Sequence, residues 1–210
     1  MVRRTKEDTQ ETRLAIIAAA RATFHQHGVT RTTMEQIATT AGVTRGAIYW
    51  HFTDKTALFY AMREQVTLPL MDRTNLELLG EKTCDPLQRI ENFLNAMMGA
   101  LTECENVQST FEIMNFKCEY VDELRPELLE CQAVHSELLA KFTSVYREAR
   151  RANLLRPDLA PDIAATDTLV FSLGLIRLWL MDESGALVRA RVTKLIAAHV
   201  NNHRAAASVV

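Results

Sequence analysis

The chain has 210 residues, of which 48% are hydrophobic, 24% charged and 7% aromatic, with 7 Gly and 5 Pro. This composition predicts a globular protein with a substantial core and excludes disordered and collagen-like classes. The net charge of −2 conceals an asymmetry: residues 1–63 hold 9 Lys and Arg against 5 Asp and Glu, whereas residues 64–210 hold 15 against 21. A basic first segment followed by an acidic remainder favours a nucleic-acid-binding module in that first segment.

The sequence shows no pattern typical of a membrane-spanning segment, a secretion signal or a cysteine-based metal site. The longest weakly polar stretch, residues 168–176, is interrupted by Arg177 and is shorter than the roughly 18 residues that a spanning helix needs. The first residues are charged and an amphipathic pattern follows, which favours the cytoplasm over secretion. The four cysteines contain no C-x-x-C pair, which argues against a disulfide framework or a structural zinc site. We expect no metal, no cofactor and no membrane partner.

Apolar residues recur at intervals of three and four along the whole chain, so the expected fold class is all-α with about nine helices. The expected helices cover residues 14–24, 33–41, 44–51, 54–79, 85–103, 106–118, 124–152, 161–180 and 186–203. Gly28 is expected to end the first helix, and Thr33 and Asp85 to cap the second and the fifth. Pro69 is expected to kink or interrupt the fourth.

Residues 33–52 have the pattern of a helix-turn-helix. This motif needs a small residue where its helices cross, a glycine-like residue in the turn and an apolar anchor on the second helix, and Ala38, Gly42 and Ile48 meet these needs. The second helix would be about 12 Å long, which suits a major groove. A plain αα-hairpin within a bundle is the alternative.

Basic and polar side chains around the motif favour DNA over the plain hairpin, because such groups bind phosphates. They are Arg45, Tyr49, His51 and Lys55 on and after the second helix, and Arg3, Arg4 and Lys6 before the first. Arg45 is the only long basic side chain on the expected reading face. One bidentate arginine–guanine contact is worth about 1–3 kcal/mol, so we expect moderate base specificity.

The run TRGAIYWHFTDK, residues 44–55, with residues 28–33 upstream, strongly resembles the recognition-helix signature of TetR-family transcriptional regulators. The resemblance implies a three-helix DNA-binding domain over residues 1–55 and a ligand-binding and dimerisation domain over 56–210. It implies DNA contacts by Thr33, Thr44, Arg45, Gly46, Tyr49, Trp50, His51 and Lys55. Packing beneath the recognition helix is the alternative for Trp50 and the favoured role for Phe52.

The rest of the chain resembles, more loosely, the AcrR/TtgR/MtrR group of the family, whose members repress multidrug efflux-pump operons. The similar segments are residues 2–7, 116–120 and 174–180. Leu173 and Leu178 depart from the group, where an acidic residue and a cationic or polar residue are common. The resemblance therefore gives no charged pocket anchor at these two positions.

Flexible apolar side chains mixed with a few polar ones occupy residues 85–180, a combination typical of a small-molecule cavity in a helix bundle. The candidate ligand contacts are Phe93, Met97, Phe111, Glu112, Met114, Asn115, Gln132, His135, Phe142 and Arg177. The alternatives are ordinary core packing for the apolar members, and solvated or paired side chains for the polar ones.

No nucleophile, acid–base pair or metal site is arranged in the sequence, so we assign no catalytic residue and expect no enzyme. His25 and His27 lie two residues apart on different helix faces, and we expect Cys118 and Cys131 to be inert.

We expect a homodimer joined through residues 160–203 that presents its recognition helices about 34 Å apart to a palindromic operator in double-stranded DNA. A hydrophobic small-molecule effector would release it by favouring the off-DNA conformation. The alternatives are a TetR-like regulator of catabolic or stress genes, and an all-α ligand-binding protein or enzyme that keeps the motif as a scaffold.

Overall fold

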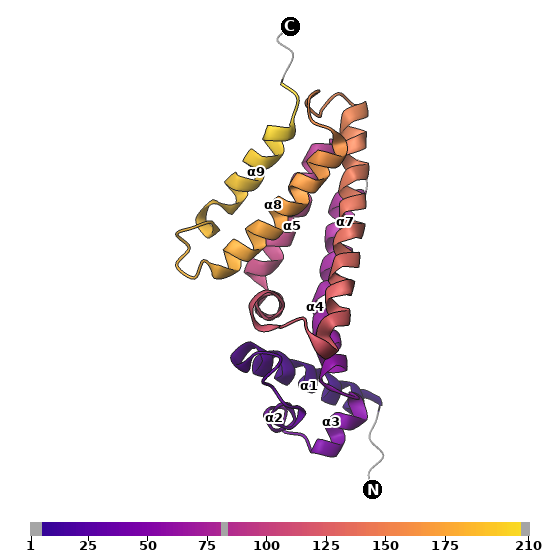
Figure 1. Cartoon of the computed structure of the whole chain (residues 1–210), viewed down its shortest axis with the longest axis vertical. Coiled ribbons are helices and arrows are strands. Elements are labelled where there is room, and N and C mark those ends of the chain that lie inside the picture. Colours follow the sequence, from indigo (N-terminus) through magenta and orange to yellow (C-terminus); the bar gives the residue numbers. More distant parts are fainter. Residues whose placement is uncertain (1–5, 81–83, 207–210) are drawn as a thin grey trace. The chain divides into compact units, whose positions relative to one another are not determined.

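The computed structural model describes residues 6–80 and 84–206, and their regular elements are helical (Figure 1). The α-helices are α1 (Lys6–His27), α2 (Met34–Thr40), α3 (Arg45–His51), α4 (Lys55–Leu79), α5 (Pro86–Glu103), α6 (Glu105–Glu112), α7 (Arg125–Arg151), α8 (Pro161–Met181) and α9 (Val192–His203). A π-helical turn, Ile113–Lys117, follows α6, and 3₁₀ turns cover Asp122–Leu124 and Arg189–Arg191. The predicted all-α class is confirmed for the described residues.

These helices form two compact units. The first unit holds the chain up to Pro69 and a returning segment, Glu105–Glu127, whereas the second holds Leu70–Cys104 and the chain from Leu128 onwards. The first unit extends beyond the DNA-binding domain expected over residues 1–55, because α6 packs against α1 and the first part of α4 shares the core of the motif. The boundary at residue 55 concerns function, and it remains a prediction.

Pro69 lies inside α4 and does not interrupt it. The proline ring removes one backbone donor from the helical ladder. Gln65, whose carbonyl has lost its helical partner, and Pro69 are both exposed, so water can reach that carbonyl. The division between the two units falls at this residue, and α4 therefore belongs to both.

One apolar core holds the first unit together. It contains Phe24 of α1, Ile37 of α2, Ile48 of α3 and Phe59 of α4, all fully buried. Ile113 of the returning segment belongs to the same cluster. Burying a side chain of this size contributes roughly 1.5–3 kcal/mol, so the core fixes the two short helices of the motif against α1.

In the second unit, α5 packs against α9, and α7 and α8 contribute to the same interior. Asp85 caps α5 as predicted, because its Oδ1 accepts the backbone N–H of Gln88 at 2.9 Å. Arg204 donates to the other oxygen of this carboxylate at 3.1 Å. The end of the described chain is thereby fixed to the start of α5.

The last helix begins at Val192, later than the predicted start at Ala186. The buried Asp182 carboxylate explains the difference, because its Oδ2 accepts the backbone N–H groups of Val188 at 2.8 Å and Arg189 at 2.9 Å. Residues 182–188 therefore form a loop around the carboxylate instead of a helical turn. Burial acts against the charge of Asp182, but the backbone hydrogen bonds and the nearby Arg189 hold its pKa at about 2.

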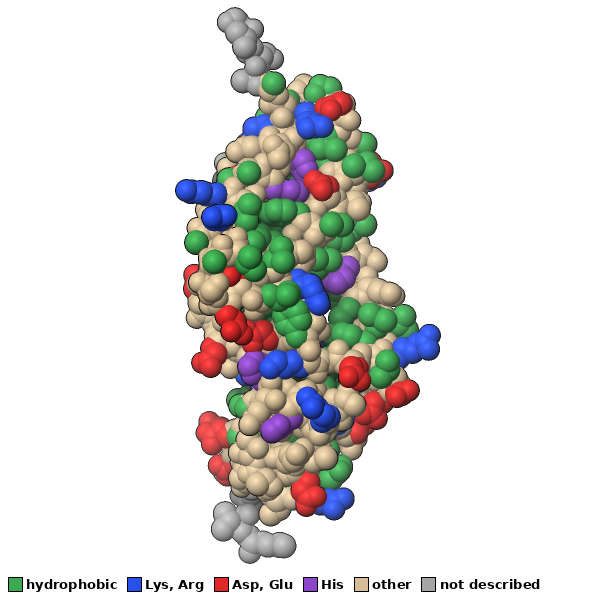
Figure 2. Space-filling model, turned by 60° about the vertical axis from the view of Figure 1, so that its left-hand side comes forward, with side chains coloured by type: hydrophobic (Ala, Val, Ile, Leu, Met, Phe, Trp, Pro, Cys, Tyr) green, Lys and Arg blue, Asp and Glu red, His purple; other side chains and the backbone are tan. Residues whose placement is uncertain are grey.

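Helix α8 has a buried face and an exposed apolar face. The exposed large hydrophobic residues are Ile163, Val170, Leu173, Leu178 and Met181. Figure 2 shows hydrophobic side chains gathered over α8 and α9. By length and composition alone α8 could span a membrane. Its most apolar 18-residue stretch has a mean hydropathy of 1.5, and 44% of that stretch is buried. The expectation that no segment is long enough is wrong for α8, although a core helix of a soluble protein meets the same criteria.

Candidate nucleic-acid interface

Two capped helices build the helix-turn-helix. The Thr33 hydroxyl accepts the backbone N–H of Gln36 at 3.2 Å, and Gln36 Oε1 accepts that of Thr33 at 2.8 Å, which completes the predicted capping box. Thr44 caps α3 by accepting the backbone N–H of Ala47 at 3.2 Å. Gly42 forms the turn with a φ of 68°, a left-handed conformation that glycine adopts without steric cost.

Helix α3 is fixed by one apolar side chain, Ile48, which is buried in the core of the first unit. Phe52, directly after the helix, packs in the same core, so its predicted packing role is confirmed. Arg45, Gly46 and Tyr49 are exposed. A Cβ at Gly46 would meet nothing within 4 Å, so the backbone there is open to a close approach.

The exposed side of α3 carries one cation and two aromatic rings. The Arg45 guanidinium lies 5.9 Å from the centroid of the Tyr49 ring. The Trp50 side chain is 70% exposed, and its ring meets that of His51 edge-on at 4.6 Å. The alternative that Trp50 packs beneath the helix is therefore wrong, because Ile48 and Phe52 fill that position. This surface offers hydrogen-bond donors and flat apolar faces together, as contact with phosphates and bases requires.

Two predicted phosphate contacts are partly engaged within the unit. His51 is half-buried against the Trp50 ring. Lys55 donates to the Thr30 carbonyl at 3.1 Å, lies 3.8 Å from the Glu123 carboxylate, and has a side chain that is 17% exposed. Binding a phosphate would require Lys55 to change these contacts. Arg3 and Arg4 lie outside the described residues, so the roles of all four residues remain predictions.

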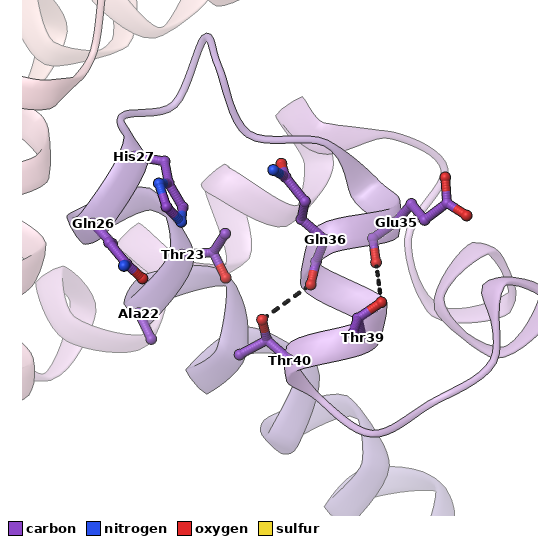
Figure 3. A pocket seen from close by; sticks show the side chains of 8 residues that line it. All are labelled: Ala22, Thr23, Gln26, His27, Glu35, Gln36, Thr39 and Thr40. Carbon is purple, nitrogen blue, oxygen red and sulfur yellow. Dashed lines mark hydrogen bonds between the residues drawn. The ribbon is translucent and has the colours of Figure 1, made fainter.

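A polar hollow beside α2 was not anticipated from the sequence (Figure 3). It has a volume of about 330 Å³ and is lined by Ala22, Thr23, Gln26, His27, Glu35, Gln36, Thr39 and Thr40. The Thr39 and Thr40 hydroxyls each donate to the carbonyl four residues earlier at 3.0 Å, which leaves their oxygens able to accept. Two adjacent exposed threonines after the buried Ile37 were the available signal in the sequence. These hydroxyls extend the polar surface of the motif.

Four of the predicted ligand contacts belong to the first unit: Phe111, Glu112, Met114 and Asn115. Glu112 Oε2 lies 2.5 Å from His25 Nε2, and the two residues line a polar cavity of about 580 Å³ between α1 and α6. Met114 packs against the core of the unit, and Asn115 donates to the Phe111 carbonyl at 2.9 Å. This polar cavity does not match the expected hydrophobic effector.

The other six belong to the second unit: Phe93, Met97, Gln132, His135, Phe142 and Arg177. Phe93 and Phe142 are buried with their ring centroids 5.1 Å apart. His135 is half-buried, and burial lowers its pKa. Gln132 and Arg177 are exposed. The structure thus brings two of the aromatic residues together, and the ligand role of the whole set remains a prediction.

Two family models match the chain. Residues 16–62 match the bacterial regulatory proteins of the tetR family, and residues 85–204 match the C-terminal region of MAATS-type transcriptional repressors. Among curated proteins, the repressor BepR of Brucella suis is 32% identical over 99% of both chains, and the regulator TtgR of Pseudomonas putida is 36% identical over 86% of both.

Solved structures agree with this assignment. NalD, the secondary repressor of the MexAB-OprM multidrug efflux pump in Pseudomonas aeruginosa, has a TM-score of 0.82 and 32% identity, with 95% of this chain and 98% of NalD covered. SmeT, the repressor of the SmeDEF efflux pump of Stenotrophomonas maltophilia, has a TM-score of 0.79 in its triclosan complex and 29% identity, with 96% of this chain and 95% of SmeT covered. The chain therefore belongs to the TetR family of DNA-binding transcriptional repressors.

Proposed function

We propose that this protein represses a multidrug efflux-pump operon in the cytoplasm, without catalytic activity, and leaves its operator when a hydrophobic small molecule binds. The observation that carries the proposal is the exposed surface of Arg45, Tyr49 and Trp50 on a capped helix that Ile48 anchors. The choice of target is supported by the similarity to NalD and SmeT, which repress efflux pumps.

Helix α3 would lie in the major groove with Arg45 directed at a base edge. Thr44, Tyr49 and His51 would contact phosphates on either side, and the open backbone at Gly46 would let the helix approach closely. Phosphate contacts fix the register of the protein on DNA, and base contacts supply the specificity.

The exposed apolar face of α8 supports dimerisation within residues 160–203. Ile163, Val170 and Met181 recur on this face at helical spacing and are each more than half exposed. Exposed apolar residues gathered on one face of a helix favour a contact with another chain. A two-fold dimer would present two recognition helices to successive major grooves, about 34 Å apart, on a palindromic operator.

Release from DNA requires the effector to bind the off-DNA conformation more tightly, and couplings of about 1–3 kcal/mol are typical. In the second unit, Phe93, His135 and Phe142 would contact the effector. Because α4 belongs to both units, a shift of its second half would be transmitted to the first unit along one continuous helix.

DNA binding is tested with the full chain by fluorescence anisotropy, using duplex DNA from upstream of its own gene and of the efflux-pump operons of the same genome. We expect Arg45→Ala to weaken binding by about 1–3 kcal/mol, which is roughly 5- to 150-fold, because it removes the main base contact. Arg151→Ala is the matched control, since it removes an exposed arginine at the end of α7. Equal affinities of the two variants for the pump-gene DNA would contradict the assignment of the recognition helix.

Effector release is tested on the same complex with triclosan, which forms a complex with SmeT, and with other hydrophobic antimicrobials. We expect at least one of them to dissociate the wild-type protein from DNA at a concentration that leaves its helical circular-dichroism signal unchanged. If none dissociates the complex, the drug-responsive part of the proposal is wrong and the DNA-binding part stands.

A further inference from the structure

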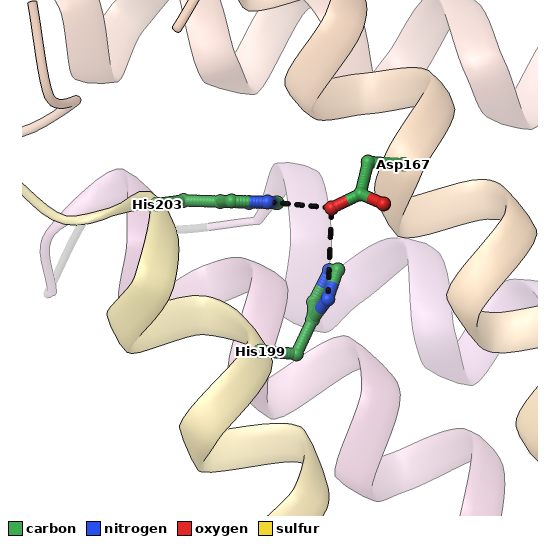
Figure 4. A group of neighbouring side chains, drawn as sticks. All are labelled: Asp167, His199 and His203. Carbon is green, nitrogen blue, oxygen red and sulfur yellow. Dashed lines mark hydrogen bonds and ion pairs between the residues drawn. The ribbon is translucent and has the colours of Figure 1, made fainter.

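Three side chains of the second unit converge on one point between α8 and α9 (Figure 4). His199 and His203 lie four residues apart on α9, and therefore on one face of the helix. Asp167 of α8 faces both. Its Oδ2 lies 2.8 Å from His203 Nε2 and 3.9 Å from His199 Nδ1, and one ligand atom from each residue lies within 4.8 Å of the other two.

Hydroxyl groups hold the two imidazole rings from behind. His203 Nδ1 lies 2.9 Å from the Tyr146 hydroxyl, and His199 Nε2 lies 3.0 Å from the Thr168 hydroxyl. Each ring can therefore donate its outer N–H to a hydroxyl oxygen and present a lone pair at its inner nitrogen. Tyr146 and Thr168 are themselves hydrogen-bonded at 2.6 Å, which locks the arrangement. Metal-binding histidines are oriented by outer hydrogen bonds of this kind.

The cluster is buried on one side and open on the other. The side chains of His199 and His203 are 8% and 5% exposed, whereas that of Asp167 is 56% exposed. The ring of Phe171 stacks on that of His199 with 4.1 Å between centroids and closes one flank.

We propose that Asp167, His199 and His203 bind one divalent transition-metal ion of the zinc type, with water at the remaining position on the exposed side. Two imidazoles and one carboxylate are ligands that Zn²⁺ accepts, and a site of three protein ligands plus water is a common arrangement for it. Before an ion binds, the Nε2–H of His203 faces Asp167; when an ion binds at Nε2, the one proton of the neutral ring lies on Nδ1 and is donated to the Tyr146 hydroxyl oxygen. The sequence expectation of no metal considered only His25, His27 and the cysteines.

The proposal is tested by calorimetric titration of ZnCl₂ into full-length protein that carries no polyhistidine tag and has been stripped of metal with a chelator. We expect one ion per chain and no comparable binding of MgCl₂, since Mg²⁺ prefers oxygen ligands. Cobalt(II) serves as a spectroscopic probe, and we expect the visible absorption of a four-coordinate site. The oligomeric mass is measured in the same samples, because Asp167 shares the exposed side of α8 with the dimer contact proposed above.

Asp167→Ala removes one ligand from an exposed helix position without disturbing the interior. We expect its zinc affinity to fall by more than roughly tenfold, whereas Asp162→Ala, which removes another exposed carboxylate of α8, keeps the wild-type affinity. Tyr146→Phe keeps the ring and loses the hydroxyl behind His203, and we expect zinc to bind it roughly 10–100-fold more weakly. The site would be refuted by zinc binding of equal strength in wild type and Asp167→Ala, by an unchanged cobalt spectrum in that variant, or by no zinc binding to the wild type.

Discussion

The polar side chains proposed to bind a partner lie on the outside of the first unit, whereas the main polar cluster of the second unit lies in its interior. In the first unit the functional surface is the outer side of a short motif, where Arg45, Tyr49 and Trp50 point away from the core. In the second unit the polar groups turn inward and bond to one another, as Tyr146, Thr168 and His203 do. The recognition surface of the first unit thus presents side chains to a partner, whereas the polar cluster of the second unit holds helices in register.

The largest expected difference between the units is the effect of replacing a tryptophan, because the chain has two of them, Trp50 in the first unit and Trp179 in the second. Trp179 is 5% exposed and lies under the Arg189 guanidinium at 4.1 Å, so we expect Trp179→Ala to lower the free energy of unfolding by about 3–5 kcal/mol. Trp50→Ala should change it by less than about 0.5 kcal/mol and weaken operator binding instead. Urea unfolding followed by circular dichroism measures the first effect and anisotropy the second. Similar losses of stability in both variants would remove the contrast between the units.

Buried ion pairs give the next largest effect, and they occur in both units. Arg63 Nη1 lies 2.9 Å from Glu127 Oε2, and the Glu127 side chain is fully buried. Arg63→Ala leaves that carboxylate in the interior without its cation, so we expect a loss of about 3 kcal/mol.

Arg89→Ala is the comparison in the second unit. Its partner Glu148 is 27% exposed and can be solvated, so we expect a smaller loss, about 1–2 kcal/mol. Both losses are measured by urea unfolding of the single variants and of Arg63→Ala/Glu127→Gln, which should recover part of the stability. A larger loss of stability for Arg89→Ala than for Arg63→Ala would contradict this. It would show that the burial of the carboxylate does not decide how much stability is lost when its arginine is removed.

The Thr33 cap tests whether the motif depends on local hydrogen bonds. Thr33→Ala removes the side chain that accepts the Gln36 N–H, and we expect a loss of about 1 kcal/mol in the free energy of unfolding. Thr40→Ala is the control, because Thr40 donates only to a carbonyl within α2 and its replacement should be nearly neutral. A neutral Thr33→Ala would show that tertiary packing alone holds α2.

The smallest effect concerns Asp182 and pH. Its pKa is about 2 in the folded chain and 3.8 in an ordinary setting, so the unfolded state binds more protons between these values. The stabilisation is complete above about pH 4 and is lost as the pH falls towards 2. Acid unfolding at constant salt should therefore be steeper for the wild type than for Asp182→Asn over this interval. Parallel curves would mean that the carboxylate is not held by the loop.

Local patterns predicted the first unit well. The capping box at Thr33, the turn at Gly42 and the anchor at Ile48 all appear in the structure, because each depends on residues a few positions apart. Prediction failed where distant groups intervene. The loop around Asp182 delays α9, and Trp50 is exposed because Phe52 already occupies the core.

The sequence by itself determined the helical class, the helix caps and the DNA-binding motif. Apolar periodicity and helix capping both depend on residues that are only a few positions apart in the chain. Only the tertiary structure placed Asp167 between His199 and His203, and Tyr146 and Thr168 behind them. These residues come from α7, α8 and α9, and their spacing in sequence carries no information about where three helices meet. That meeting is decided by which apolar faces bury each other, a property of the whole unit rather than of any one segment.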